Sequence, residues 1–146
     1  QTVWPGRMTK VAEHPYIYVD GAHNVAAWEY LRTSVEKYFT NRRLIYIIGV
    51  LKDKEYEKMV EILAPTMAAA VVITPDTPRG LPKEILAPLI QAQGVPAQLA
   101  DTSAEALQKA REQAGETGVI LVSGSLSFLA EYLQLESGDE NNGASR

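Results

Sequence analysis

The stretch YIYVDGAHNVAAWEYL, residues 16–31, joins the pattern of a buried β-strand to that of an amphipathic α-helix. Residues 16–19 are all apolar or aromatic, and Trp28 and Leu31 stand three positions apart, on one face of a helix. The corner between the two patterns carries an acid, Asp20, and an imidazole, His23. Because a strand that runs directly into a helix begins a β–α–β unit, the stretch predicts an α/β fold.

The same alternation continues along the chain. Short apolar, β-branched runs predict further strands at 43–50, 69–74, 96–100 and 118–124. Helices are predicted from apolar stripes at helical spacing, which comprise Trp28, Leu31, Val35 and Tyr38; Tyr56, Met59, Val60 and Leu63; Ile85, Leu86, Leu89 and Ile90; Leu107, Ala110 and Ala114; and Leu126, Leu129, Ala130 and Leu133.

This order of elements predicts one doubly wound, mostly parallel, Rossmann-like sheet with helices on both faces. Residues 6–15 precede the first of these strands and are expected to pair with it as an antiparallel edge strand near the N-terminus. Among local signals, the sequence from Thr102 to Glu105 has capping-box spacing, Asp53 is expected to cap the next helix, and Pro88 predicts a kink or a split in the third helix.

Bulk composition excludes several classes of function. With 14 Lys and Arg against 18 Asp and Glu, the net charge of -4 offers no general attraction for nucleic acid or an anionic membrane. The chain has no cysteine and only two histidines, which argues against disulfides, thiol nucleophiles, thiolate metal sites and a zinc centre. No apolar run approaches the ~20 residues that span a bilayer, and we expect a cytoplasmic protein.

The ends of the chain suggest a piece of a longer protein. The sequence opens without Met in the middle of a pattern and closes on the polar run SGDENNGASR. We therefore expect one domain over residues 1–136, a disordered tail over residues 137–146, and a further domain outside this chain.

Ligands of open α/β sheets collect beyond the carboxyl ends of the strands. In this chain the rule selects residues 20–24, 51–53, 75–79, 101–103 and 123–127. At the first place, Asp20 could accept hydrogen bonds from a ribose diol, while His23 and the first helical amides could face an anion. The alternative is structural, with Asp20 or Asn24 capping the helix and His23 serving as a turn residue.

Three further residues have both a binding and a structural interpretation. Ser125 follows Gly124 between a strand and a helix, where it could line an anion site or cap the helix. Arg79, in the proline-stiffened loop TPDTPRGLP, could hold a carboxylate, and Arg7, after a Trp-Pro-Gly turn, could hold a phosphate. Either arginine could instead form a surface ion pair.

No G-x-x-x-x-G-K-[ST] phosphate loop occurs in the chain, and no G-x-G-x-x-G follows a strand. The domain therefore has candidate residues for a ribose and for part of a phosphate group, but no phosphate-binding loop, so it would form only half of a nucleotide site. The other half is expected from a preceding domain.

Taken in order, the motifs resemble a known family. They are WPGR ending at Arg7, DGAHN from Asp20 to Asn24, Lys52-Asp-Lys54, Pro78-Arg79 and Gly124-Ser-Leu126. From about Val3 to about Leu135, the chain resembles the C-terminal domain of folylpolyglutamate synthases and bifunctional dihydrofolate synthases, which are Mur-type ATP-dependent amide ligases. The family pattern usually has proline after DGAHN, whereas Val25 stands here, which should loosen the turn slightly without removing its contacts.

The resemblance implies a reaction and a set of roles. ATP, with Mg²⁺ and a P-loop supplied by an N-terminal domain, phosphorylates a folate carboxylate, and the amine of L-glutamate attacks the acyl phosphate. Arg7 then falls at the ATP phosphates and Asp20 at the ribose hydroxyls. His23, a candidate catalytic residue, falls near the phosphate or the glutamate, and Ser125 and Arg79 are candidate glutamate contacts.

Two alternatives remain open from the sequence. The chain could belong to a Mur-type ligase that adds a different amino acid, because a fold alone does not fix the substrate. It could also be a stand-alone module that binds a nucleotide or an anion for regulation. In the favoured interpretation the partners are folate, glutamate and the N-terminal P-loop domain of the same monomeric enzyme.

Overall fold

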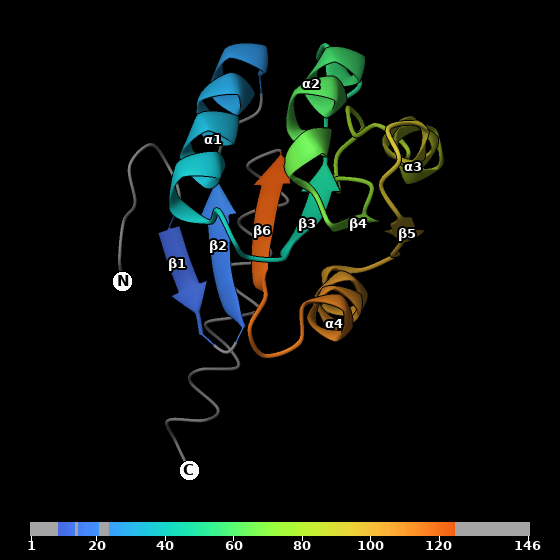
Figure 1. Cartoon of the computed structure of the whole chain (residues 1–146). Coiled ribbons are helices and arrows are strands. Elements are labelled where there is room, and N and C mark those ends of the chain that lie inside the picture. The colour runs from blue at the N-terminus through green and yellow to red at the C-terminus, as the bar shows by residue number, and fades with distance from the viewer. Residues whose placement is uncertain (1–8, 14, 21–23, 125–146) are drawn as a thin grey trace.

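A computed structural model of the chain describes residues 9–13, 15–20 and 24–124 (Figure 1). These residues form one six-stranded sheet with helices packed against it. The elements, in chain order, are β1 (Thr9–Ala12), β2 (Tyr16–Asp20), α1 (Val25–Tyr38), β3 (Leu44–Gly49), α2 (Tyr56–Leu63), the 3-10 turn η1 (Ala64–Thr66), β4 (Ala69–Val72), α3 (Lys83–Ala92), β5 (Ala97–Leu99), α4 (Ser103–Ala114) and β6 (Val119–Gly124).

The strand order is β1-β2-β6-β3-β4-β5. All neighbours from β2 to β5 run parallel, and β1 pairs antiparallel with β2 at one edge. The mostly parallel α/β sheet with an antiparallel edge strand is therefore confirmed. The chain returns from β5 to insert β6 between β2 and β3, so the last described strand lies in the middle of the sheet (Figure 1).

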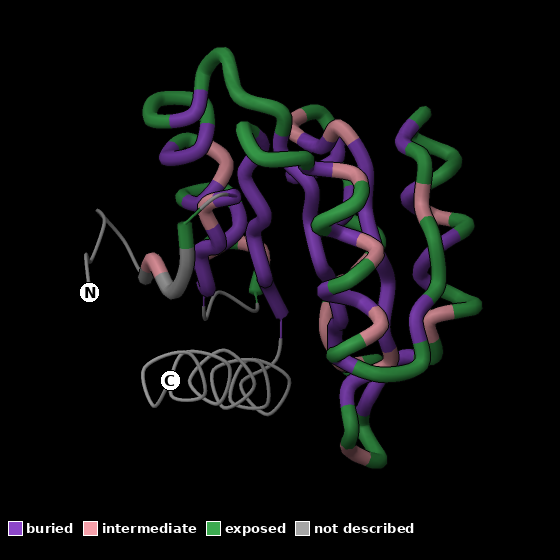
Figure 2. The backbone as a smooth tube through the Cα atoms, turned by 90° about the horizontal axis from the view of Figure 1, so that it is seen from below, coloured by how far each residue is buried: buried purple, intermediate pink, exposed green. Residues whose placement is uncertain are grey.

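Two apolar cores cover the two faces of the sheet. Alternate strand residues pack with α1, α2 and α3 on one face, where Trp28, Leu63 and Leu86 are fully buried, and with α4 on the other, where Ala106 is fully buried. Figure 2 shows buried strands between helices whose outer sides are exposed. Every residue of β3 and β6 is buried, as expected of strands covered on both faces.

Most local signals act as expected. Thr102 caps α4, since its hydroxyl oxygen accepts a hydrogen bond from the Glu105 amide at 3.0 Å, and a Glu105 carboxylate oxygen accepts one from the Asp101 amide at 2.7 Å. Pro88 lies inside α3, which continues as one helix to Ala92, so the expected split is wrong. The exposed proline removes the hydrogen bond that residue 88 would have donated to residue 84, and the helix continues past it.

The predicted stripe from Leu126 to Leu133 lies outside the described residues, and two residues of the described stripes lie outside the core. Tyr38 and Ile85 are exposed, and Phe39, one position beyond Tyr38, is buried in the core instead. Helical spacing predicts which face is apolar, but the end turns of a helix can depart from that face: Tyr38 lies in the last turn of α1 and Ile85 in the first turn of α3. In the described part of the chain, no helix is both long enough and apolar enough to cross a membrane.

Candidate functional site

The carboxyl ends of β2, β6 and β3 form one continuous edge of the sheet. Asp20 pairs in register with Ser123, Ser123 with Ile48, and Gly124 with Gly49. The first and last of the five places selected from the sequence therefore meet at Asp20 and Ser123, which are far apart in the chain. This edge is where a doubly wound sheet binds its ligands.

Asp20 is a buried carboxylic acid, only 3% exposed, at the end of β2. It is not the cap of α1, because Asn24 is the N-cap residue and its side-chain oxygen accepts a hydrogen bond from the Ala27 amide at 2.8 Å. Of the two capping alternatives, only Asn24 is correct. Since ionisable side chains are seldom buried without a specific reason, Asp20 retains its candidacy as a binding residue.

Two glycines allow close backbone contacts at this edge, Gly124 between the ends of β6 and β3, and Gly49 between the end of β3 and the chain just after β4. Gly124 has a φ of 134°, and a Cβ atom at this position would lie 2.9 Å from the carbonyl carbon of Gly49 and overlap its oxygen. At Gly49, a Cβ atom would lie 2.8 Å from the Ile73 carbonyl oxygen. A side chain at either position would force the backbones apart, so glycine fixes the shape of this edge.

Ser123 was not singled out from the sequence, although it lies in one of the selected places. Its side chain is fully buried, and its hydroxyl oxygen has no hydrogen-bond partner within the described ranges. The available signal was a polar residue at the end of the otherwise apolar run VILV. It places a hydroxyl beside Asp20 in the sheet.

A second cluster joins the loop after β3 to the loop after β4. Arg79 donates a hydrogen bond to a carboxylate oxygen of Asp53 at 2.6 Å, and the Lys52 amide donates to the Arg79 carbonyl at 2.8 Å. The predicted capping role of Asp53 is wrong, because Glu55 is the N-cap residue of α2 and makes no side-chain cap. The Arg79 guanidinium holds the pKa of Asp53 below its ordinary value.

The loop that carries Arg79 has a fixed turn beneath it. The Thr77 carbonyl accepts a hydrogen bond from the Gly80 amide at 2.9 Å, and a Cβ atom at Gly80 would overlap the Pro75 carbonyl oxygen. Arg79 is 57% exposed and Asp53 53% exposed. The guanidinium is therefore positioned by its backbone but accessible to an incoming anion.

The place around Asp101 is occupied by a structural ion pair. A carboxylate oxygen of Asp101 lies 3.1 Å from the ammonium group of Lys83, at the start of α3, and a carboxylate oxygen of Glu84 lies 3.3 Å from the same group. The hydrogen bond to Asp101 raises the pKa of Lys83 above its ordinary value. These contacts tie the chain just after β5 to α3.

Three of the predicted site residues, Arg7, His23 and Ser125, lie outside the described residues, as does the predicted tail at 137–146. Their roles stay predictions. Of the two predicted residues that the structure does describe, Asp20 lies at the end of β2 and Arg79 in the loop after β4. The loops that follow β3 and β4 are joined to each other through Asp53 and Arg79.

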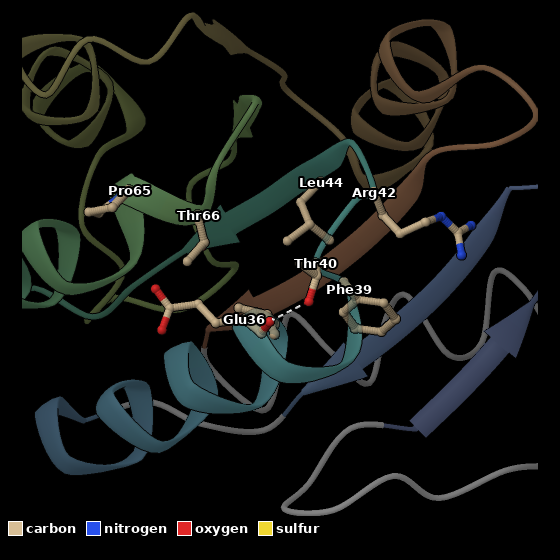
Figure 3. Close-up of a pocket in the computed structure, with 8 residues that line it drawn as sticks. Glu36, Phe39, Thr40, Arg42, Leu44, Pro65 and Thr66 are labelled. Carbon is tan, nitrogen blue, oxygen red and sulfur yellow. Dashed lines mark hydrogen bonds between the residues drawn. The ribbon is translucent and has the colours of Figure 1, made fainter.

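A pocket of about 420 Å³ lies elsewhere, at the amino-terminal end of β3 (Figure 3). Its walls include Glu36 and Phe39 near the end of α1, Leu44 at the start of β3, and Thr66 in η1. Asp20 lies at the opposite, carboxyl end of the parallel strands, so this pocket is separate from the candidate site.

Metal ligands are not gathered anywhere in residues 9–13, 15–20 and 24–124, where no group of three or more His, Cys, Asp or Glu side chains could hold an ion. The predicted ribose role of Asp20 requires no metal, because a carboxylate can accept hydrogen bonds from two hydroxyl groups; this role stays a prediction.

Comparison with known proteins agrees with this architecture. The dihydrofolate synthase/folylpolyglutamate synthase of Bacillus subtilis is 29% identical over 132 residues, which are 90% of this chain and 30% of that protein. The structure of Escherichia coli FolC in complex with DHPP and ADP is 27% identical, with a TM-score of 0.84 over 94% of this chain and 32% of that one.

A third relative is the bifunctional folylpolyglutamate synthase/dihydrofolate synthase of Yersinia pestis, whose structure was solved with AMPPNP and a Mn ion. Its sequence is 25% identical, and the two structures match with a TM-score of 0.78 over 90% of this chain and 31% of that one. This chain thus spans about a third of the relatives that it matches. The family of the Mur ligase, glutamate ligase domain, matches residues 6–126, and the chain belongs to that family.

Proposed function

We propose that this chain acts as the C-terminal domain of an ATP-dependent amide ligase that adds L-glutamate to folates. The observation that carries the proposal is the family match over residues 6–126, combined with a buried Asp20 that helix capping does not explain. The name of the Bacillus subtilis relative includes both folylpolyglutamate and dihydrofolate synthase, so the proposal includes both acceptors. The absence of cysteine supports action in the cytoplasm.

The proposed reaction proceeds in two steps. The terminal phosphoryl group of ATP passes to a carboxylate oxygen of the folate substrate, and ADP leaves. The amine of glutamate then attacks the acyl carbon, a C–N bond forms, and phosphate leaves with the former carboxylate oxygen, while the amine proton passes to solvent. Phosphoryl transfer depends mainly on positioning and charge stabilisation, which are the roles proposed for the residues of this domain.

Asp20 is assigned to the ribose hydroxyls and Arg7 to the phosphates. His23 is assigned to the boundary between phosphate and glutamate. The support for Asp20 is its burial and its position at the carboxyl end of β2. The neighbouring domain is proposed to supply the P-loop and the Mg²⁺ ligands, and its closure over this edge would exclude water from the acyl phosphate.

Arg79 is assigned, with Ser125, to a carboxylate of the incoming glutamate. For this contact the guanidinium must exchange Asp53 for the substrate. Exposed ion pairs contribute little to stability, so the exchange costs little. The existing pair supports the role, because it demonstrates that a carboxylate can approach Arg79 in this loop conformation.

A substrate panel tests the proposal in the complete ligase, in which this chain is joined to the P-loop domain that the proposal requires. With a reduced folate and Mg²⁺, ATP hydrolysis should depend on L-glutamate and release one ADP for each amide formed. L-aspartate, L-alanine and D-glutamate serve as controls. A different preferred amino acid would indicate another Mur-type ligase, and measurable ATP affinity of the 146-residue chain alone would favour a stand-alone nucleotide-binding module.

A further inference from the structure

The hydroxyl group of Ser123 is the unexplained feature of the carboxyl edge. The side chain is 0% exposed, and its oxygen has no hydrogen-bond partner in the part of the chain that the structure describes. A folded protein with a buried, unpartnered hydroxyl is less stable than the same protein with alanine at that position, because the hydroxyl loses its hydrogen bonds to water on folding. Packing alone therefore gives no reason for a serine at this position.

Ser123 faces the same side of the sheet as Asp20. Side chains alternate along a strand, and Leu121 packs in the core beneath α1, α2 and α3, whereas Val122 packs in the core beneath α4. In β2 the corresponding residues are Tyr18 and Val19, so Asp20 and Ser123 both project toward α1, α2 and α3. The neighbour of Ser123 on its other side is Ile48, which is apolar.

The two polar side chains are within reach of each other. They are register partners on adjacent parallel strands, which lie about 4.8 Å apart. The hydroxyl oxygen lies one bond from Cβ and the carboxylate oxygens two bonds from Cβ, so rotation of the two side chains can bring them to hydrogen-bond distance. The close contact between Gly124 and Gly49 fixes the backbone next to Ser123, which leaves side-chain rotation as the available movement.

We propose that Ser123 is a positioning residue for Asp20: its hydroxyl donates a hydrogen bond to one carboxylate oxygen of Asp20 when the other oxygen accepts from a nucleotide ribose. This inference rests on the proposed ribose role of Asp20. The hydrogen bond would hold the carboxylate in the orientation that the ribose requires. A hydroxyl that is unpartnered in the absence of nucleotide would then gain its partner on binding.

The proposal predicts opposite effects on stability and on binding. Ser123→Ala removes an unsatisfied buried hydroxyl, so the thermal midpoint of the nucleotide-free protein should stay the same or rise. The same change should weaken binding of a non-hydrolysable ATP analogue about tenfold, as expected for loss of a hydrogen bond to a charged group. A residue with only a packing role would not give this combination.

The test is a double-mutant cycle in the complete ligase, with the dissociation constant of the ATP analogue measured by calorimetry. Asp20→Ala should weaken binding, and adding Ser123→Ala should then have no further effect, because Ser123 acts through Asp20. Ser123→Cys, which keeps the size but donates poorly, should resemble Ser123→Ala. The control is Ser34→Ala: the buried hydroxyl of Ser34 already donates to the Tyr30 carbonyl at 3.1 Å, and its loss should leave nucleotide binding unchanged.

Two results would overturn the inference while leaving the proposed function intact. One is unchanged binding in Ser123→Ala while Asp20→Ala binds weakly. The other is an equal loss on adding Ser123→Ala in the presence and absence of Asp20. If Asp20→Ala itself leaves binding unchanged, the ribose role of Asp20 fails and the inference fails with it.

Discussion

Replacement of Gly124 by alanine should break the carboxyl edge of the sheet. Gly124 has a φ of 134°, a conformation that costs a residue with a side chain about 1–3 kcal/mol. The added Cβ atom would also lie 2.9 Å from the carbonyl carbon of Gly49 and overlap its oxygen, so the pair Gly49–Gly124 must separate. With about 1 kcal/mol for a lost backbone hydrogen bond, Gly124→Ala should reduce the free energy of unfolding by about 2–4 kcal/mol, and the overlap with Gly49 adds to this loss.

The matched control is Gly94→Ala. Gly94 also has a positive φ, of 86°, but a Cβ atom there would meet nothing within 4 Å. Gly94→Ala should therefore reduce the free energy of unfolding only through its unfavourable backbone conformation, by about 1–2 kcal/mol. Equilibrium urea unfolding of both variants, with unchanged slopes, gives the comparison. Equal losses in the two variants would contradict the close approach of β3 and β6 on which this site depends.

Two further predictions concern the Arg79–Asp53 pair. Arg79→Ala in the complete ligase should raise the KM for glutamate about tenfold, because a hydrogen bond to a charged group is lost, and should leave the KM for ATP unchanged. A selective rise in the KM for ATP would contradict the glutamate role. Because Arg79 lowers the pKa of Asp53, the pair stabilises the fold above the ordinary carboxyl pKa, and this contribution disappears as the pH falls through the lowered value. Carbon NMR should find the titration of the Asp53 carboxyl below the ordinary range in the unmodified chain and back within it in Arg79→Ala; identical titrations would exclude the pair in solution.

The sequence predicts the elements of this fold well because each depends on local patterns. The runs that become β3 and β6 are apolar on successive residues, and Thr102 and Glu105 cap α4 within one turn of chain. The order of the strands in the sheet could not be predicted in this way, because no local pattern indicates that β6 lies between β2 and β3. Ser123 could therefore not be matched with Asp20 until the sheet was known.

The residues of the candidate site show the same difference between local patterns and tertiary contacts. Asp20 could be selected from its position at the end of a strand, but only the structure shows that Asn24, and not Asp20, accepts the capping hydrogen bond from the Ala27 amide. Asp53 has a good spacing for a cap, and its actual partner, Arg79, is 26 residues away in another loop. Local chemistry thus identifies polar residues at strand ends, while their partners depend on tertiary contacts.

The central claim is that Asp20 contacts the ribose of ATP in a glutamate ligase. The most direct measurement compares the dissociation constants of ATP and 2′,3′-dideoxy-ATP for the complete ligase and its Asp20→Ala variant, with substrate absent. The unmodified enzyme should bind ATP at least about tenfold more tightly than the dideoxy analogue, as expected for hydrogen bonds to a carboxylate, and Asp20→Ala should bind the two alike. A variant that retained the full preference for ATP would contradict the account.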